Sequence, residues 1–198
     1  MPSDPEWDPQ DLTPEEGILI PACVSGTESS GIQSDIQIEV VDLGERCRKL
    51  QGSVWIPAER QQVWQVLTDY DHLAEFIPNL VESRVIGRED GRTLVRQVGS
   101  QKVLFAQFSA AVVLAIEEIF PQQLRFQKTE GDFLIFEGFW DLADLSAHQT
   151  LLTYHLQVKP PRRMPVGLVE RRICRDLALN LQAIRERCLS LSDYSQPV

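Results

Sequence analysis

The sequence predicts an α+β fold in which a curved antiparallel sheet packs against one long C-terminal helix. Strand-like segments joined by short turns follow one another between residues 81 and 158, and an amphipathic helix bounded by prolines comes after them. The strands alternate apolar with polar residues, so the sheet has one apolar face. Because the helix carries the only other large apolar surface, we expect it to lie across that face in a two-layer arrangement.

The first part of this fold consists of two strands and two short helices. Apolar and polar residues alternate over 36–41, and 46–56 is strand-like up to Pro57. The spacing of Val63, Trp64 and Leu67 predicts a helix over 59–68, and a further helical turn over 73–76 ends before Pro78. The two helices therefore separate the second strand from the rest of the sheet.

The rest of the sheet is expected to be an antiparallel meander with strands at 81–88, 92–100, 103–118, 122–129, 132–144 and 149–158. The clearest alternation runs from 104 to 116, where every second residue is apolar. The same test applied to the later strands makes the inner face rich in aromatic residues. Its aromatic members are Phe108, Phe126, Phe136, Trp140 and Tyr154.

The C-terminal helix is expected from residue 166 to about 190. Pro160 and Pro161 stop the last strand, and Pro165 stands just before the helix. One helical face is apolar and is suited to cover the sheet. It bears Val166, Val169, Ile173, Leu177, Leu181, Ile184 and Cys188.

The net charge of −10 is concentrated at the N-terminus. Residues 1–45 contain eleven acidic residues and no Lys or Arg, whereas residues 46–198 contain eighteen acidic and nineteen basic residues. We expect an acidic flexible extension over 1–34, a folded domain over 35–191 and a C-terminal tail over 192–198. General nucleic-acid binding by this nearly neutral domain is not expected.

The sequence contains no recognisable targeting or cofactor motif. Its N-terminus lacks the basic start and apolar stretch of a secretory signal, and its longest apolar run, Ala110–Ile116, is far shorter than the roughly 20 residues that span a bilayer. We therefore expect a cytoplasmic protein. The four cysteines form no C-x-x-C pair, and phosphate-loop, dinucleotide and zinc-protease patterns are missing, so no metal or other cofactor is expected.

Three segments carry a resemblance to a known superfamily: residues 53–59, residues 63–80 and Gly138-Phe-Trp140. Together with the proline-bounded C-terminal helix, they resemble the START-like superfamily of polyketide cyclase/dehydrase and lipid-transport proteins (SRPBCC) over residues 46 to about 190. Segment 63–80 is similar to cyanobacterial and plastid members, and more distantly to the coenzyme Q-binding branch. The resemblance implies a helix-grip fold, in which about seven strands and two short helices accompany a long helix that closes an apolar cavity.

In such a fold the helix stands off the sheet, and part of the inner face lines a ligand cavity. Arg96 or its neighbour Gln97, whichever faces inward, could orient the polar end of a ligand. No histidine is expected to face inward, and no acid–base pair has a spacing that identifies a catalytic residue. The expected cavity residues are Phe76, Arg96, Leu104, Phe108, Phe126, Phe136, Trp140, Tyr154, Met164, Val166, Ile173 and Leu177.

The resemblance implies binding, and with it transport, of a hydrophobic small molecule such as a lipid, an isoprenoid quinone, a pigment or a polyketide-like compound. A polyketide aromatase/cyclase-type enzyme and a protein-interaction module with the same fold are the alternatives. A basic cluster near the expected cavity mouth predicts peripheral contact with an anionic membrane surface. It consists of Lys159, Arg162, Arg163, Arg171 and Arg172.

Overall fold

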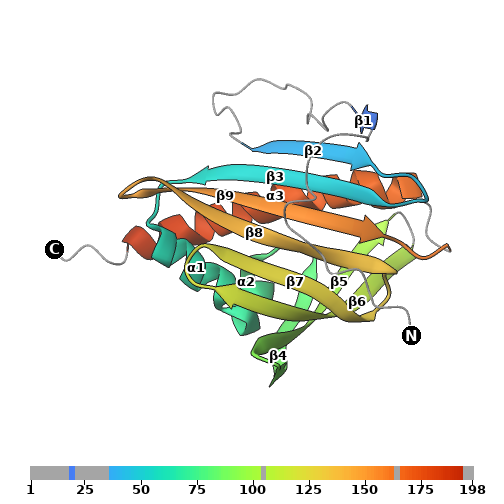
Figure 1. Cartoon of the computed structure of the whole chain (residues 1–198), viewed down its shortest axis with the longest axis horizontal. Coiled ribbons are helices and arrows are strands. Elements are labelled where there is room, and N and C mark those ends of the chain that lie inside the picture. Colours follow the sequence, from blue (N-terminus) through green and yellow to red (C-terminus); the bar gives the residue numbers. More distant parts are fainter. Residues whose placement is uncertain (1–17, 21–35, 104–105, 163–165, 194–198) are drawn as a thin grey trace.

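The computed structural model describes residues 18–20, 36–103, 106–162 and 166–193 of the chain. Among them one nine-stranded antiparallel sheet curves around a long helix (Figure 1). The strands follow one another across the sheet in the order β1-β2-β3-β9-β8-β7-β6-β5-β4. The early strand β3 therefore lies beside the last strand β9, and the strands from β4 to β9 form the expected meander. The α+β arrangement predicted from the sequence is confirmed.

Two short helices and a 3₁₀ turn lie between β3 and β4, and the long helix α3 follows β9. The strands are β1 (Ile18–Ile20), β2 (Gln37–Asp42), β3 (Arg48–Ile56), β4 (Leu80–Glu89), β5 (Arg92–Val103), β6 (Ala106–Ile119), β7 (Gln123–Gly131), β8 (Ile135–Ser146) and β9 (Gln149–Lys159). The helices are α1 (Arg60–Thr68), the 3₁₀ turn η2 (Tyr70–His72), α2 (Leu73–Phe76) and α3 (Val166–Asp193).

The structure differs from the sequence-based expectation at two places in the sheet. The short strand β1 pairs with β2, Ile18 facing Asp42, inside the segment 1–34 that was predicted as an extension. A run of three residues is too short to display a strand period. The second difference is the start of β6, because β5 continues to Val103. The sequence has no Gly, Pro, Asn or Asp between residues 103 and 106 to indicate where one strand ends and the next begins. The remaining residues of 1–34 lie outside the described part of the chain.

Helix α3 packs most tightly on β3. Gly52 lies under Leu177, where an added Cβ would stand 2.8 Å from the leucine Cδ2. Around this contact the apolar core is closely packed, with Leu50, Val54 and Leu181 fully buried. Because residue 52 has no side chain, α3 packs directly against the backbone of β3. The position of α3 is therefore fixed by its contact with this strand.

A buried arginine joins the beginning of α3 to the strands beneath it. The Arg48 Nε donates to Glu170 Oε2 at 2.6 Å, and its Nη1 donates to Asp42 Oδ1 and to the Cys47 carbonyl oxygen. The Arg48 side chain is 11% exposed and that of Glu170 is 16% exposed. This guanidinium therefore connects β2, β3 and the first turns of α3, from which several cavity residues project.

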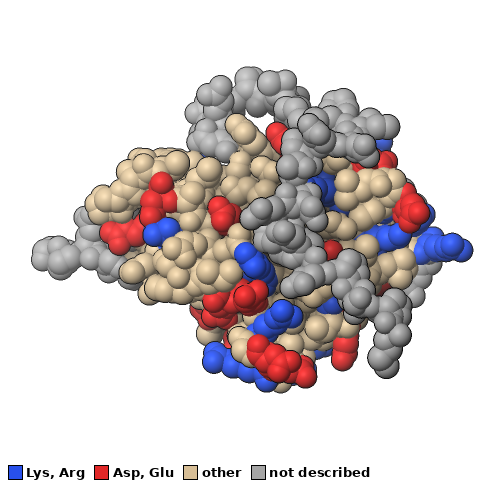
Figure 2. Space-filling view, in the orientation of Figure 1, with Lys and Arg blue, Asp and Glu red and all other residues tan. Residues whose placement is uncertain are grey.

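The described surface carries both signs of charge. On the face shown in Figure 2, basic and acidic side chains are interspersed and form no continuous basic surface. Cys47, Cys174 and Cys188 are buried. Within the described residues, no helix combines the length and apolar character needed to span a membrane.

Candidate functional site: an internal cavity

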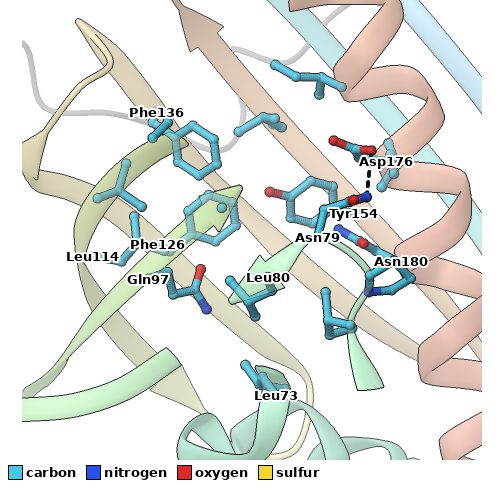
Figure 3. Close-up of a pocket in the computed structure, with 18 of the residues that line it drawn as sticks. Leu73, Asn79, Leu80, Gln97, Leu114, Phe126, Phe136, Tyr154, Asp176 and Asn180 are labelled. Carbon is cyan, nitrogen blue, oxygen red and sulfur yellow. Dashed lines mark hydrogen bonds between the residues drawn. The ribbon is translucent and has the colours of Figure 1, made fainter. Parts of the chain in front are cut away.

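A cavity of about 460 Å³ lies between α3 and the inner face of the sheet. Its volume falls in the range of about 300–1,000 Å³ that is typical of small-molecule sites. Side chains from α3, from the strands and from the turn before β4 point into the same space (Figure 3). The helix, the sheet and the short helices therefore all contribute side chains to its walls.

Aromatic rings from neighbouring strands form one wall of the cavity. Tyr154 stacks on Phe126 at a centroid distance of 5.6 Å and lies 4.2 Å from the ring of Trp140. Phe136 extends this group through contacts with Phe126 at 6.0 Å and Phe133 at 5.2 Å. Because the rings support one another, they present a preformed apolar surface to the cavity.

Gly138 explains how these rings fit together. It is paired with Phe126 across β7 and β8, and an added Cβ would lie 2.9 Å from the Phe126 Cζ. The glycine therefore leaves the space into which the phenylalanine ring extends. This is a structural reason for the Gly138-Phe-Trp140 segment noted in the sequence.

The opposite wall contains a polar cluster of four residues: Asn79, Arg172, Asp176 and Asn180. Asn79 Nδ2 donates to Asp176 Oδ1 at 3.3 Å, and Arg172 Nε donates to Asp176 Oδ2 at 2.9 Å. The Asn180 Oδ1 is buried without a hydrogen-bond partner. All four residues line the cavity. Figure 3 shows Asn79, Asp176 and Asn180 close together, across the cavity from Phe126 and Phe136.

Asn79 reaches this cluster because of an unusual backbone conformation in the turn before β4. Its φ is +63°, a left-handed value that asparagine tolerates better than most residues. The conformation is held by a hydrogen bond from the Ser100 amide to the Asn79 carbonyl oxygen at 2.9 Å. The turn thus aims the Asn79 amide at α3, 97 residues later in the chain.

Burial changes the acidity of two groups in the cavity. Burial raises the pKa of the Asp176 carboxyl above its ordinary value, while Arg172 beside it acts in the opposite direction. Burial also raises the pKa of the Tyr154 phenol, which therefore stays protonated at neutral pH. The cavity consequently combines apolar walls with a small number of hydrogen-bonding groups.

The structure places half of the sequence-predicted cavity residues in the lining. These are Phe126, Phe136, Trp140, Tyr154, Ile173 and Leu177. Leu104 and Met164, and the side chains of Phe108 and Val166, lie outside the described part of the chain. Whether the lining residues contact a ligand stays a prediction.

Two predicted cavity residues, Phe76 and Arg96, are not part of the lining. Phe76 packs against the edge of the core, with the Arg187 guanidinium 5.6 Å from its ring centroid. Arg96 points to the outer face of the sheet and forms an ion pair with Glu82 on β4. Its neighbour Gln97 faces inward and lines the cavity, because adjacent residues of a strand point to opposite faces.

The polar cluster was not anticipated from the sequence, although α3 contains a signal for it. Asp176 and Asn180 follow Ile173 by three and seven residues, so they lie on the same helical face as the apolar stripe. Polar residues inside an apolar stripe mark positions where a helix faces something other than a dry core. Asn79 gives no comparable signal.

The three histidines lie away from the cavity, as the sequence predicts. His72 is exposed beside Asp69, and His148 is exposed beside Glu59. His155 lies on the outer face of β9 and stacks on Phe139 at 4.2 Å, and burial together with nearby Lys49 lowers its pKa to about 4. No histidine is therefore available as an acid or base inside the cavity.

Solved structures with the same architecture come from several organisms. The Zhui aromatase/cyclase from Streptomyces sp. R1128 matches with a TM-score of 0.64 and 16% identity, over 77% of this chain and 99% of that one. A STAR-related lipid transfer protein fragment from Xanthomonas axonopodis matches with a TM-score of 0.65 and 16% identity, over 87% and 98%. Human StAR-related lipid transfer protein 5 matches with a TM-score of 0.67 and 8% identity, over 92% and 91%. These similarities show that the fold is the START-like helix-grip fold.

The sequence itself leads to the same group of proteins. No curated protein sequence matches the chain significantly. The family described as "Polyketide cyclase / dehydrase and lipid transport" matches residues 56–185, which extend from the end of β3 into the last third of α3 and include almost the whole cavity. The chain therefore belongs to the polyketide cyclase/dehydrase and lipid transport family.

Proposed function

We propose that this protein binds a hydrophobic small molecule in the cavity and carries it between sites in the cell. The observation that supports this most directly is the cavity itself, about 460 Å³ bounded by stacked aromatic and aliphatic side chains. Protein cores are normally packed without voids of this size. An apolar space with a few polar groups in its wall is the usual form of a small-molecule site.

The polar groups of the cavity fit binding better than acid–base catalysis. Both Asp176 oxygens already accept hydrogen bonds, from Asn79 and Arg172. The Tyr70 hydroxyl is engaged as well, since it donates to Glu118 Oε1 at 3.0 Å. Each Asp176 oxygen keeps a second lone pair, but the described cavity lining contains no histidine and no second carboxylate that would form an acid–base pair with Asp176. For this reason we favour a carrier over an aromatase/cyclase-type enzyme.

Substitution of Trp140 by Ala is expected to weaken ligand binding more than it weakens the fold. Loss of a fully packed tryptophan costs about 3–5 kcal/mol. Trp140 borders the cavity, so we expect a smaller loss of unfolding free energy, together with a drop of at least about tenfold in affinity for the neutral fluorescent probe N-phenyl-1-naphthylamine. Urea denaturation and probe titration measure the two quantities.

Leu181→Ala is the matched control for Trp140→Ala. Leu181 is fully buried on α3 but is not part of the cavity lining. Its loss should cost about 2–5 kcal/mol and leave probe affinity of the folded protein unchanged. If the wild-type protein fails to bind the probe, the cavity is not a ligand site. If the wild-type protein does bind the probe, mass spectrometry of an organic extract of the purified protein identifies the class of its natural ligand.

We also propose that the protein collects its ligand at an anionic membrane surface, through fewer basic residues than the sequence suggested. Lys159 pairs with Glu45 at 3.2 Å, and Arg172 is directed at Asp176 in the cavity. Arg162, Arg171 and Arg175 are exposed near the beginning of α3, and Arg163 lies outside the described residues. A membrane surface that contains the anionic lipid phosphatidylserine attracts each such basic residue with a free energy of about 1 kcal/mol.

Arg171→Gln/Arg175→Gln is expected to reduce co-sedimentation with phosphatidylcholine vesicles containing phosphatidylserine by about tenfold or more at low salt. Binding to pure phosphatidylcholine should not change. The control is Arg88→Gln/Arg92→Gln, which removes the same charge from exposed positions at the turn between β4 and β5. Equal losses for the two double variants would mean that net charge, and not this surface, determines membrane binding.

A further inference from the structure

The cavity runs along α3 and has two unlike ends. Arg172 and Ile184 both line it, and their separation on this helix corresponds to roughly 18 Å. At one end, the side chains of Arg172 and Asp176 are each 26% exposed, so the cavity meets solvent there. At the other end, the lining residues Leu67, Leu124 and Ile184 are buried. An elongated ligand would therefore have one end near charged groups and the other in an apolar interior.

The Arg172 guanidinium is held in position from one side. Its Nε donates to Asp176 Oδ2 at 2.9 Å, and Asn79 Nδ2 donates to the other oxygen of this carboxylate at 3.3 Å (Figure 3). A guanidinium has five N–H donors in a planar fork, and the contact with Asp176 uses one of them. Among the described residues, none accepts a hydrogen bond from Arg172 Nη1 or Nη2. Arg172 can therefore donate to a ligand while it keeps its contact with Asp176.

The charges around Asp176 favour an acceptor over a cation at this end of the cavity. Burial raises the pKa of the Asp176 carboxyl, while Arg172 and Arg175 lower it, so two cations act on one carboxylate. The ammonium head of a ligand would meet this excess of positive charge. A carbonyl or carboxylate oxygen would instead be attracted by the N–H groups of the guanidinium.

We propose that Arg172, held by Asp176, is a specificity-determining residue that binds the carbonyl or carboxylate oxygen of an amphiphilic ligand. The apolar chain of this ligand lies inward, along the rings of Phe126 and Trp140, and its head group stays at the open end. This inference rests on the proposed binding function of the cavity. It assigns the ligand to the class of acyl compounds and ketones with an apolar chain, and it disfavours cationic amphiphiles.

Three ligands with twelve-carbon chains test the head group: dodecanoate, 2-dodecanone and dodecylammonium, each measured at neutral pH by displacement of N-phenyl-1-naphthylamine. We expect the wild-type protein to bind dodecanoate and 2-dodecanone at least about tenfold more tightly than dodecylammonium. In Arg172→Met, affinity for the acceptor ligands should fall by about tenfold, while affinity for dodecylammonium should stay the same or rise. A loss for dodecanoate alone assigns an anionic head group, and a loss for both acceptors assigns a carbonyl oxygen of either charge state.

Arg171→Met is the matched control, because it removes the same charge from the adjacent residue of α3, which is exposed and is not part of the cavity lining. The three affinities should change by less than about twofold in this variant.

Two results would show that the assignment of Arg172 is wrong although the cavity still binds apolar molecules. One is equal binding of dodecylammonium and dodecanoate by the wild type, and the other is an equal change of the affinities in Arg172→Met and Arg171→Met. If the wild type binds neither the probe nor any of the three compounds, the proposed function fails as well. The wild-type comparison decides the question even if Arg172→Met does not fold.

Discussion

Gly138→Ala is expected to prevent the chain from folding. An alanine Cβ at this position would stand 1.9 Å from the His155 carbonyl oxygen, and that oxygen belongs to the backbone of the neighbouring strand β9. A backbone atom in the centre of a sheet cannot move away without breaking the ladder on both sides. Soluble expression and the far-ultraviolet circular dichroism melt measure the effect, and we expect no cooperative unfolding transition.

Gly167→Ala is the control for this substitution. Gly167 lies in the first turn of α3 with no atom within 4 Å of an added Cβ. Alanine there should raise the free energy of unfolding by about 0.5–1 kcal/mol, because glycine loses more backbone entropy in a helix. A Gly138→Ala protein that unfolds cooperatively with near-wild-type stability would contradict the packing described for β8 and β9.

Arg48→Met is expected to reduce the free energy of unfolding by about 3 kcal/mol. The substitution leaves the largely buried Glu170 and the partly buried Asp42 without their cation, and breaking a buried ion pair from one side costs about 3–5 kcal/mol. We expect a value at the lower end of this range because Asp42 keeps contact with water. Urea denaturation measures the change.

Two further variants show whether the stability loss comes from the unpaired acids. Arg48→Met/Glu170→Gln removes the acid that is most deeply buried, so it should recover about half of the loss. Arg84→Met removes an exposed arginine that pairs with Glu82 and should cost less than about 1 kcal/mol. If the loss for Arg48→Met is as small as that for Arg84→Met, the beginning of α3 does not depend on this ion pair.

Strand and helix periods account for most of the fold that could be predicted. Alternation placed Phe126, Phe136, Trp140 and Tyr154 on the inner face, and these residues line the cavity. This worked because a side chain in a half-buried strand has only two directions, and one of them is selected by burial. The prediction failed at Arg96 because both faces of that strand carry apolar residues. Leu94 and Val98 share a face with Arg96, and Val95 shares a face with Gln97, so burial does not select one of the two directions.

The amino-acid sequence by itself determined the order of the elements from β2 onward, the apolar face of the clearly alternating strands and the apolar stripe of α3, because these follow from local periodicity. Tertiary structure alone decided the site that gives the cavity its chemical character. Asn79 meets Asp176 only because the turn before β4 passes beneath α3, and Gln97 faces inward only through the pairing of β5 with β4 and β6. Contacts between residues so far apart depend on how the sheet curves around the helix, and periodicity within one segment carries no information about that.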